Sequence, residues 1–588
     1  ALFGGLYNTA TQTFNVQDRT SGFAATQLFT PYRYSNHSLY VADRWPVFRG
    51  LTLSLGLRYE LFPAMKLDNG LALEPTFADP NNFMASLLTR TGTTNFIGGN
   101  AGTDKAYYKT DFNNFAPSVG IAYTPHFASG VGRFLFGGEG KSVFRGGYSQ
   151  AYGNDSIVTS INNAASGNPG LGSTVVTPVN LNGRVAAGSA PIATPAFVAP
   201  PLTYLQNNQN ASFFGTIFAI DPNIGVPKIE QYSFGFQREF FGNTALEIRY
   251  VGSRSKNLVR GIDINQIDIF NNGFLADFNR ARANLTLTGD PFCTAAGCQA
   301  LQIFVNGPGA AGRLGVNSAA ANAVGRINRT TFINNLTNGT PADLALSYIN
   351  SALNLNNHPT VANPNASPFI NFVANPAAGA IDVMVNDANF NYNSLQIEVR
   401  RRFAQGLYFQ ANYTYSKNLT NAIGTGQTLF EPYLDNNHPE LDRQRADFDI
   451  PHVFNLNGIY QLPFGKGRMF LDRGGLLDRI VGGWEISGIV QWTSGTPITF
   501  VDNRGTVNRA GRSGRQTPQT NLTGDQIRAL GGIFEANGAI YFMNPDAITN
   551  PVFFPNEPGQ TGNTPRAILD SPKYFNVDMA LLKNIRFG

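Results

Sequence analysis

The strongest constraint on the fold of this chain is a strict alternation of apolar and polar residues. In the stretch GLYFQANYTYSKNL (residues 406–419), every second residue from Leu407 reads Leu, Phe, Ala, Tyr, Tyr, and the residues between them read Tyr, Gln, Asn, Thr, Ser. Successive side chains of a β-strand point to opposite faces, so this pattern predicts a strand with one apolar and one polar face. The polar face carries almost no charge.

The same period of two recurs in stretches of roughly ten residues along the whole chain. In LTLSLGLRYEL (residues 51–61), Leu occupies alternate positions, and in GGWEISGIVQWTSG (residues 482–495) Trp484 and Trp492 share a face opposite Glu485. Eleven strands are predicted in this way, near residues 34–43, 50–61, 115–124, 142–152, 229–238, 244–253, 391–401, 406–417, 452–462, 483–493 and 573–582.

The connections between these strands alternate in length. Short or intermediate connections are expected near residues 43–50, 125–141, 241–243, 402–406 and 463–482, and long ones near residues 62–114, 153–228, 254–390, 418–451 and 494–572. Structureless loops beyond about 12–15 residues are uncommon in soluble domains. An antiparallel barrel across an outer membrane has short turns on one side and long loops on the other. A soluble β-sandwich would bury the apolar face but would not explain the alternation of loop lengths.

The predicted fold is therefore all-β: an antiparallel transmembrane β-barrel in a bacterial outer membrane, with long extracellular loops and short periplasmic turns. The content of charged residues supports this reading, because it is 14%, against about 25% in typical soluble domains. No apolar run reaches the 18 residues of a transmembrane helix. The basic residues are dispersed, so nucleic acid is not an expected partner. The N-terminal sequence ALFGGLYNTA has no basic, apolar leader, so any signal peptide is expected to be missing or already removed.

The two faces of the strands have different expected surroundings. The apolar face is expected to contact lipid. Because a bilayer core contains no water, the backbone groups of the strands must pair with one another in a closed structure. The lipid-facing or aromatic-girdle candidates on the apolar face are Leu53, Leu55, Leu57, Tyr59, Phe234, Tyr413, Tyr415, Trp484 and Trp492. Trp484 and Trp492 would lie roughly 26 Å apart along the strand, or about 20 Å after the tilt of a barrel strand, close to the spacing of two aromatic girdles. The lumen-facing candidates are Arg58, Glu60, Arg145, Glu247, Arg249, Glu398, Arg400, Lys417 and Glu485. We expect them to hydrate the lumen and pair with a plug; direct contact with a solute is the alternative.

Several stretches resemble a known family. The stretches are YRYSNHSLYVADRWPVFRGLTLSLGLRYE, KSVFRGGYSQAYG, QYSFGFQREFFGNTALEIRYVGSRSKNL, NYNSLQIEVRRRFAQGLYFQANYTYSKNL and DFDIPHVFNLNGIYQLPFGKGR, the last followed by GGWEISGIVQWTSGTPITF. They look like the barrel of Oar-like TonB-dependent outer-membrane transporters, which are abundant in acidobacteria and related groups. The resemblance extends over nearly all of residues 30–588. It implies a 22-stranded barrel, an N-terminal plug and a short box that engages TonB. Neither a plug nor such a box is recognised here, so we expect one partial barrel domain over residues 1–588, about 11 of the implied 22 strands, with the plug and the closing strands absent from the chain.

The resemblance implies a transporter that moves an oligosaccharide-, peptide- or siderophore-like solute through a plugged barrel. The expected partners are outer-membrane lipid, TonB through the missing N-terminal region, and a small-molecule or oligomeric solute. Two alternatives stay open: a surface adhesin or structural outer-membrane barrel, and the protein-secretion role attributed to Oar-like members.

Nothing in the sequence predicts an enzyme, a catalytic residue, a metal site or a cofactor. GGEGKS (residues 137–142) lacks the first Gly of a phosphate-binding loop and precedes a strand, so a hairpin turn is expected. The five His do not have metal-ligand spacing. DRQRADFDIPH (residues 442–452) is interpreted as salt-bridged architecture at the start of a strand, with a cation or solute contact as the alternative. Cys293 and Cys298 are expected to form a local disulfide in an oxidising compartment.

Overall fold

The computed structural model describes most of the chain, and the following statements concern these residues. They are 9–18, 20–75, 79–89, 96–100, 106–155, 157–158, 167–178, 196–204, 206–207, 216–240, 243–307, 309, 312–317, 326–350, 370–376, 378–422, 432–512 and 516–585.

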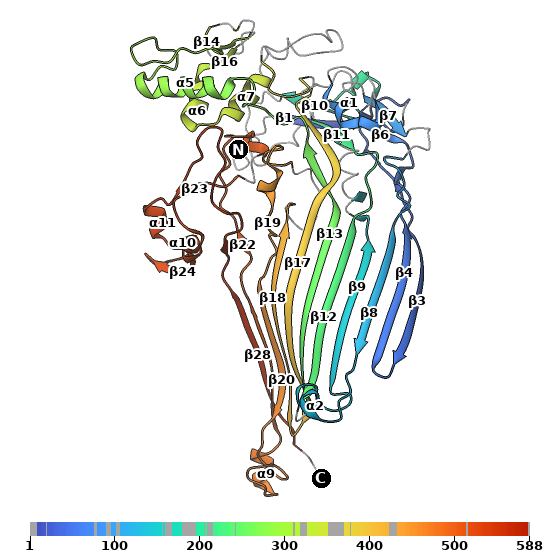
Figure 1. Cartoon of the computed structure of the whole chain (residues 1–588). Coiled ribbons are helices and arrows are strands. Elements are labelled where there is room, and N and C mark those ends of the chain that lie inside the picture. The colour runs from blue at the N-terminus through green and yellow to red at the C-terminus, as the bar shows by residue number, and fades with distance from the viewer. Residues whose placement is uncertain are drawn as a thin grey trace, which may run out of the picture.

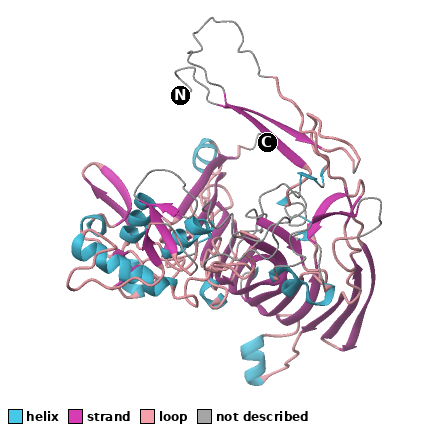
Figure 2. Ribbon diagram, turned by 90° about the horizontal axis from the view of Figure 1, so that it is seen from above, coloured by secondary structure: helices cyan, strands magenta, loops and turns pink. Residues whose placement is uncertain are grey.

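A single large sheet forms the body of the molecule, and each of its eleven long strands pairs antiparallel with the next one along the chain. These strands are β3 (His37–Phe48), β4 (Leu51–Leu61), β8 (Phe115–Tyr123), β9 (Ser142–Tyr152), β12 (Lys228–Phe240), β13 (Thr244–Asp263), β17 (Ala380–Ala404), β18 (Leu407–Thr420), β20 (His452–Gln461), β21 (Trp484–Thr493) and β28 (Tyr574–Lys583). The eleven strands predicted from alternation are thus confirmed, in order (Figure 1). Viewed from above, the sheet curves into an open trough, with β3 and β28 at its two edges (Figure 2).

Three predicted boundaries were wrong. β3 continues to Phe48, so the first turn is only Arg49 and Gly50, and the left-handed φ of 91° at Gly50 suits glycine. β13 and β17 extend together well past the expected ends, to Asp263 and back to Ala380. Irregular register near Leu258 interrupts the period of two there, which hid the extension from the pattern. Of the predicted turn at 241–243, residues 241 and 242 lie outside the described part of the chain.

The long connections are not structureless; they build a layer of small elements at one end of the strands (Figure 1). Short strands occur in pairs or threes at this loop end, or beside the large sheet: β1 (Thr9–Asn15), β2 (Tyr32–Arg33), β5 (Lys66–Leu67), β6 (Leu71–Pro75), β7 (Phe96–Asn100), β10 (Gly172–Pro178), β11 (Thr216–Ile220), β14 (Phe304–Asn306), β15 (Leu314–Asn317), β16 (Arg326–Asn328), β19 (Gln444–Arg445), β22 (Pro497–Ile498), β23 (Gln519–Thr520), β24 (Gly531–Ala536), β25 (Ala539–Met543), β26 (Phe553–Phe554) and β27 (Leu569–Asp570).

Helices accompany them: η2 (Pro80–Asn82), α1 (Phe83–Leu88), α5 (Phe274–Thr288), α6 (Arg329–Asn338), α7 (Pro341–Ile349), η4 (Pro439–Asp442), η5 (Ala510–Arg512), α10 (Gly524–Ala529) and α11 (Asp546–Thr549). α5, α6 and α7 share a hydrophobic core built around Phe274, Phe332 and Tyr348. The connection between β13 and β17 therefore folds as a cored unit, because it contains enough apolar side chains to bury.

Two further helices lie at the opposite, turn end: α2 (Gly130–Phe136) between β8 and β9, and α9 (Leu476–Val481) between β20 and β21 (Figure 1). Within the described residues, no helix has both the length and the apolar character needed to cross a membrane.

Candidate functional site: the polar face of the sheet

The pairing register places the mainly polar side of the alternating pattern on the same face in all eleven strands. Gly56 pairs with Ser118, Ser118 with Ser149, and Ser149 with Gln231. Gln231 in turn pairs with Ser253. Because directly paired residues point to the same side of a sheet, the polar positions predicted one strand at a time form one continuous surface.

Eight of the nine predicted lumen-facing residues lie on this polar face: Arg58, Glu60, Arg145, Glu247, Arg249, Glu398, Arg400 and Glu485. They do not converge on one point. Arg58 pairs with Glu60 at 2.6 Å, and Glu60 is nearly buried. Glu485 accepts a hydrogen bond from Gln461 Nε2 at 3.2 Å, far along the sheet from the first pair.

The middle of the polar face carries two carboxylates directly opposite each other, Glu247 and Glu398. Like charges in this position repel. Each has an arginine two residues further along its own strand and face: Arg249 lies 3.6 Å from Glu247, and Arg400 lies 4.0 Å from Glu398. Arg249 also donates to Gln396 Oε1 from Nε (3.1 Å) and Nη2 (2.8 Å). The charges are thus locally balanced, as expected of a hydrated wall.

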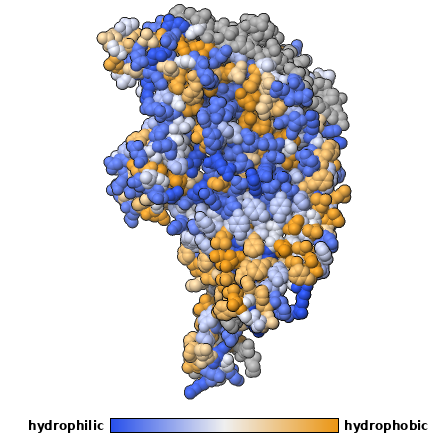
Figure 3. Space-filling model, in the orientation of Figure 1, coloured by the Kyte–Doolittle hydropathy of each residue, from blue (hydrophilic) through white to orange (hydrophobic). Residues whose placement is uncertain are grey.

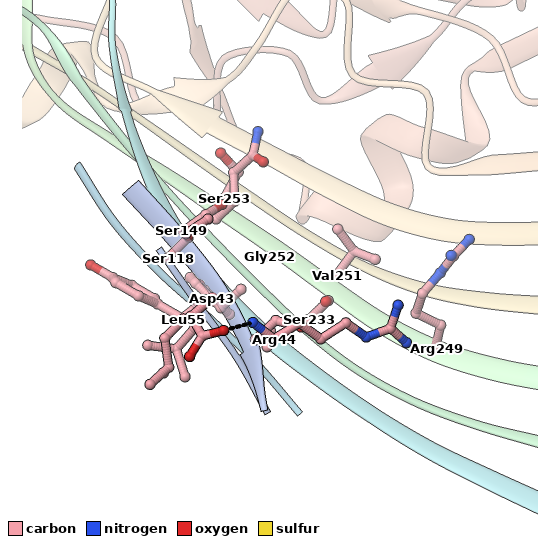
Figure 4. A pocket seen from close by; sticks show the side chains of 18 of the residues that line it. Asp43, Arg44, Leu55, Ser118, Ser149, Ser233, Arg249, Val251, Gly252 and Ser253 are labelled. Carbon is pink, nitrogen blue, oxygen red and sulfur yellow. Dashed lines mark hydrogen bonds between the residues drawn. The ribbon is translucent and has the colours of Figure 1, made fainter. Parts of the chain in front are cut away.

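Small side chains hollow out the polar face beside these charges. A cavity of about 860 Å³ lies along β3, β4, β8, β9, β12 and β13 and reaches Tyr392 of β17. The serines that line it are Ser54, Ser118, Ser149, Ser233 and Ser253, with Gly120 and Gly147 between them. Figure 4 shows several of these serines with Arg44 and Arg249. The sequence pattern marked these positions as polar, but only the register shows that they adjoin.

A second hollow of about 510 Å³ lies at the loop end of the strands. Its walls are polar: Lys109 donates to Asn223 Oδ1 at 2.9 Å, and Asn386 Oδ1 accepts from the amide of Gly225 at 2.7 Å. Tyr152 and Lys228 also line it. Its lining thus combines hydroxyl, amide and ammonium groups with the carboxylate of Asp111. This hollow was not predicted, because its residues come from the β4–β8 and β9–β12 connections and from four different strands, β9, β12, β13 and β17.

All nine predicted lipid-facing residues share the opposite, apolar face: Leu53, Leu55, Leu57, Tyr59, Phe234, Tyr413, Tyr415, Trp484 and Trp492. Its aromatic rings gather at two levels. Toward the turn end, Phe144 and Phe236 contact each other with centroids 4.8 Å apart. Toward the loop end, the ring centroid of His452 lies 5.1 Å from that of Tyr415 and 6.3 Å from that of Trp492. Figure 3 shows hydrophobic surface over the lower part of the strands.

Lys417 is a correction. Its partner across the strands is Asn393, and it shares the parity of Tyr413 and Tyr415, so it lies on the apolar face at the loop end and not on the polar face. The prediction failed because residue type was given more weight than position in the alternation. Asp43 was also missed: it lies on the apolar face opposite Leu55, near the edge of the sheet.

The charged stretch at 442–452 is a structural junction. Asp442 is 1% exposed and accepts from fully buried Arg260 at 2.6 Å and from Arg566 at 3.3 Å. The Arg260 guanidinium also lies over the Tyr433 ring, 3.5 Å from its centroid. Two connections, β18–β20 and β21–β28, are thus tied to the extension of β13. The same stretch contributes Arg445, which pairs with Asp449 at 2.8 Å.

Cys293 and Cys298 are joined by a disulfide with a Cα–Cα distance of 6.0 Å, in the segment that follows α5. In the described part of the chain, no group of His, Cys, Asp or Glu has the arrangement of a metal site.

Comparison with known proteins agrees with this architecture. The family model described as outer membrane beta barrel domain matches residues 5–588. A search of curated proteins gave no match.

The solved structures that this chain matches include those of three outer-membrane proteins. FpvA of P. aeruginosa, bound to a heterologous pyoverdine, shows 9% identity and a TM-score of 0.31, over 81% of this chain and 30% of that one. The outer membrane transporter YddB from Escherichia coli shows 10% identity and a TM-score of 0.33, over 80% and 34%. FauA from Bordetella pertussis, the alcaligin receptor, shows 10% identity and a TM-score of 0.26, over 79% and 38%. This chain therefore spans about a third of each of these proteins. The family match over nearly its whole length shows that the chain belongs to the outer membrane β-barrel domain family, whose place is the bacterial outer membrane.

Proposed function

We propose that this chain forms part of the barrel wall of a TonB-dependent outer-membrane transporter of the Oar-like type. The observation that carries the proposal is the continuous polar face, in which charges are paired and small residues leave a hollow of about 860 Å³. A wall that only anchored loops in the membrane would need no such hollow. The role is one of binding and passage and not of catalysis.

In this proposal the remaining strands, a plug and the TonB-binding segment belong to the rest of the protein, and the chain is one partial barrel domain. TonB would supply the energy by acting on the plug. The lumen-facing residues, from Arg58 to Glu485, would hydrate the lumen and pair with the plug. Loops at the loop end would capture the solute first.

The lining of the two hollows favours a polar solute. Five serines and Arg249 contribute polar groups to the hollow on the polar face, and amide, hydroxyl, ammonium and carboxylate groups line the one at the loop end. An oligosaccharide-, peptide- or siderophore-like solute presents the donors and acceptors that these groups bind.

The test is a bulky substitution in the full-length protein, produced in its own outer membrane. Ser149→Trp would fill part of the hollow, whereas Ile121→Trp, on the apolar face of the neighbouring strand β8 and outside the hollow, serves as the control. Uptake of radiolabelled candidate solutes by whole cells should fall about tenfold with Ser149→Trp, equivalent to roughly 1.4 kcal/mol, and stay near the wild-type value with Ile121→Trp.

Equal uptake by both variants at equal abundance in the membrane would refute passage along this wall. A proton uncoupler separates the classes of function. Uptake lost with the uncoupler supports energy-coupled transport. Solute bound at the surface but never taken up would instead indicate an adhesin.

A further inference from the structure

The two helices at the turn end, α2 and α9, leave apolar side chains uncovered. On or beside α2, Val131 is 73% exposed and Phe134 79%. On α9 and the segment before it, Met469, Leu476 and Ile480 are 81%, 76% and 67% exposed. Side chains of this size in such a cluster mark a surface that another apolar phase covers.

α2 is attached to the apolar face of the sheet. The ring of Phe136, its last residue, lies 5.6 Å from the ring of Phe144 and 6.1 Å from that of Phe236, and both of these side chains belong to the apolar face. Arg238 fixes the C-terminal end of the helix by donating to the carbonyl oxygens of Leu135 and Phe134. The helix is therefore held on the side of the wall that meets lipid.

α9 is attached to the same face through Trp484. The indole Nε1 of Trp484 donates to the Ile480 carbonyl at 2.9 Å, and Lys583 Nζ donates to the same carbonyl at 3.1 Å. The Lys583 ammonium lies 5.0 Å from the centroid of the Trp484 ring. Trp and Lys are the side chains that concentrate where a bilayer meets water.

The connection that contains α9 is also basic. Lys466, Arg468, Arg473 and Arg479 face only two acidic residues between residues 463 and 482. Both carboxylates are occupied by backbone amides: Asp472 accepts from Gly467 at 2.6 Å, and Asp478 accepts from Lys466 at 2.7 Å. Among the described residues, no ion pair engages Arg473 or Arg479.

We propose that α2 and α9 lie in the headgroup region of the phospholipid leaflet at the turn end, with their apolar side chains inserted and the cations around α9 bound to anionic phospholipid. Two features select lipid as the occupant: continuity with the apolar face, and a positive charge that complements anionic headgroups. An amphipathic helix at an interface buries its apolar face about 5–10 Å into this region. The role is independent of the solute that the barrel passes.

The test measures the depth of spin labels in the full-length protein reconstituted in vesicles. Labels at Phe134→Cys and Ile480→Cys report on the two helices; Met579→Cys on the apolar face and Asp525→Cys at the loop end give the acyl and aqueous references. Cys293 and Cys298 are paired and do not react with the label under non-reducing conditions. Collision rates with oxygen and with a water-soluble nickel complex are compared for each label.

In vesicles containing phosphatidylglycerol, both helix labels should lie between the two references. With Arg473→Gln and Arg479→Gln together, nickel access at position 480 should rise about twofold, and position 134 should not change. Labels at 134 and 480 as accessible to nickel as the one at 525 would overturn the proposal. Equal depth of the label at 480 in phosphatidylglycerol and in pure phosphatidylcholine would overturn its electrostatic part.

Discussion

A matched pair of substitutions in β21 tests the assignment of the two faces most sharply. Ile486 lies on the apolar face between Tyr460 and Leu581, whereas Ile489 lies on the polar face between Asn457 and Asp578. Both are isoleucines of the same strand, and both are partly exposed, at 38% and 48%. Ile486→Arg and Ile489→Arg therefore make the same chemical change in two surroundings.

The expected change in the free energy of unfolding follows from the depth of Ile486 in the bilayer. Trp484 and Trp492 bracket the apolar stretch of β21, and Ile486 lies two residues inside the first, or roughly 7 Å along the strand. An arginine facing lipid costs about 2–4 kcal/mol at the midplane and about 0–1 near the interfaces. Ile486 lies about halfway between the interface and the midplane, so Ile486→Arg should lower the free energy of unfolding by about 2 kcal/mol. Ile489→Arg should change it by less than about 0.5 kcal/mol, because the new side chain is hydrated and lies beside Asp578.

Denaturant unfolding of the full-length protein in phospholipid vesicles, followed by tryptophan fluorescence, measures both values. The slope of the transition must be the same in both variants for the comparison to hold. Equal destabilisation at both positions, or a larger loss at Ile489, would refute the assignment of lipid and water to the two faces.

Three further predictions concern particular contacts. Asp442→Asn should cost about 3–5 kcal/mol of stability at the loop end, because it leaves buried Arg260 with an uncompensated charge; denaturant titration should show less than about 0.5 kcal/mol for the exposed control Asp525→Asn. Burial raises the pKa of Asp382 to about 6. In the folded state, Arg512 donates two hydrogen bonds of 2.9 Å to this carboxyl. The Asp382 carboxyl of the folded state takes up a proton as pH falls from 7.5 to 5. When residues 505–512 open and the Asp382 carboxyl has its ordinary pKa, it does not. Hydrogen exchange of residues 505–512, corrected for intrinsic rates, should therefore slow at pH 5 by about 1.4 kcal/mol of protection, and Asp382→Asn should remove this dependence. A Cβ at Gly252 would lie 2.1 Å from the Tyr232 ring, so Gly252→Ala should cost about 1–3 kcal/mol; with Tyr232→Ala already present, the same denaturant titration should show most of that cost gone.

The number, order and faces of the membrane strands were readable from the sequence, since a period of two depends only on local geometry and on the polarity of the two sides. Where the alternation was followed strictly, as at Trp484 and Glu485, the predicted face agrees with the register. Where residue type overruled it, as at Lys417, the prediction was wrong.

Which residues of different strands and connections adjoin is visible only in the folded structure. Because of the pairing register, five serines from five separate strands line one hollow. The loop end could not be predicted either: Arg260 meets Asp442 across 182 residues of chain, and that pairing depends on how the β13–β17 extension, η4 and the segment at Arg566 pack together. The strands and their two faces could be predicted from the sequence, because alternation is a property of each strand. The hollow, the buried charges and the attachment of α2 and α9 to the apolar face were decided by the tertiary structure, because contacts between distant segments depend on register and packing and not on any local pattern.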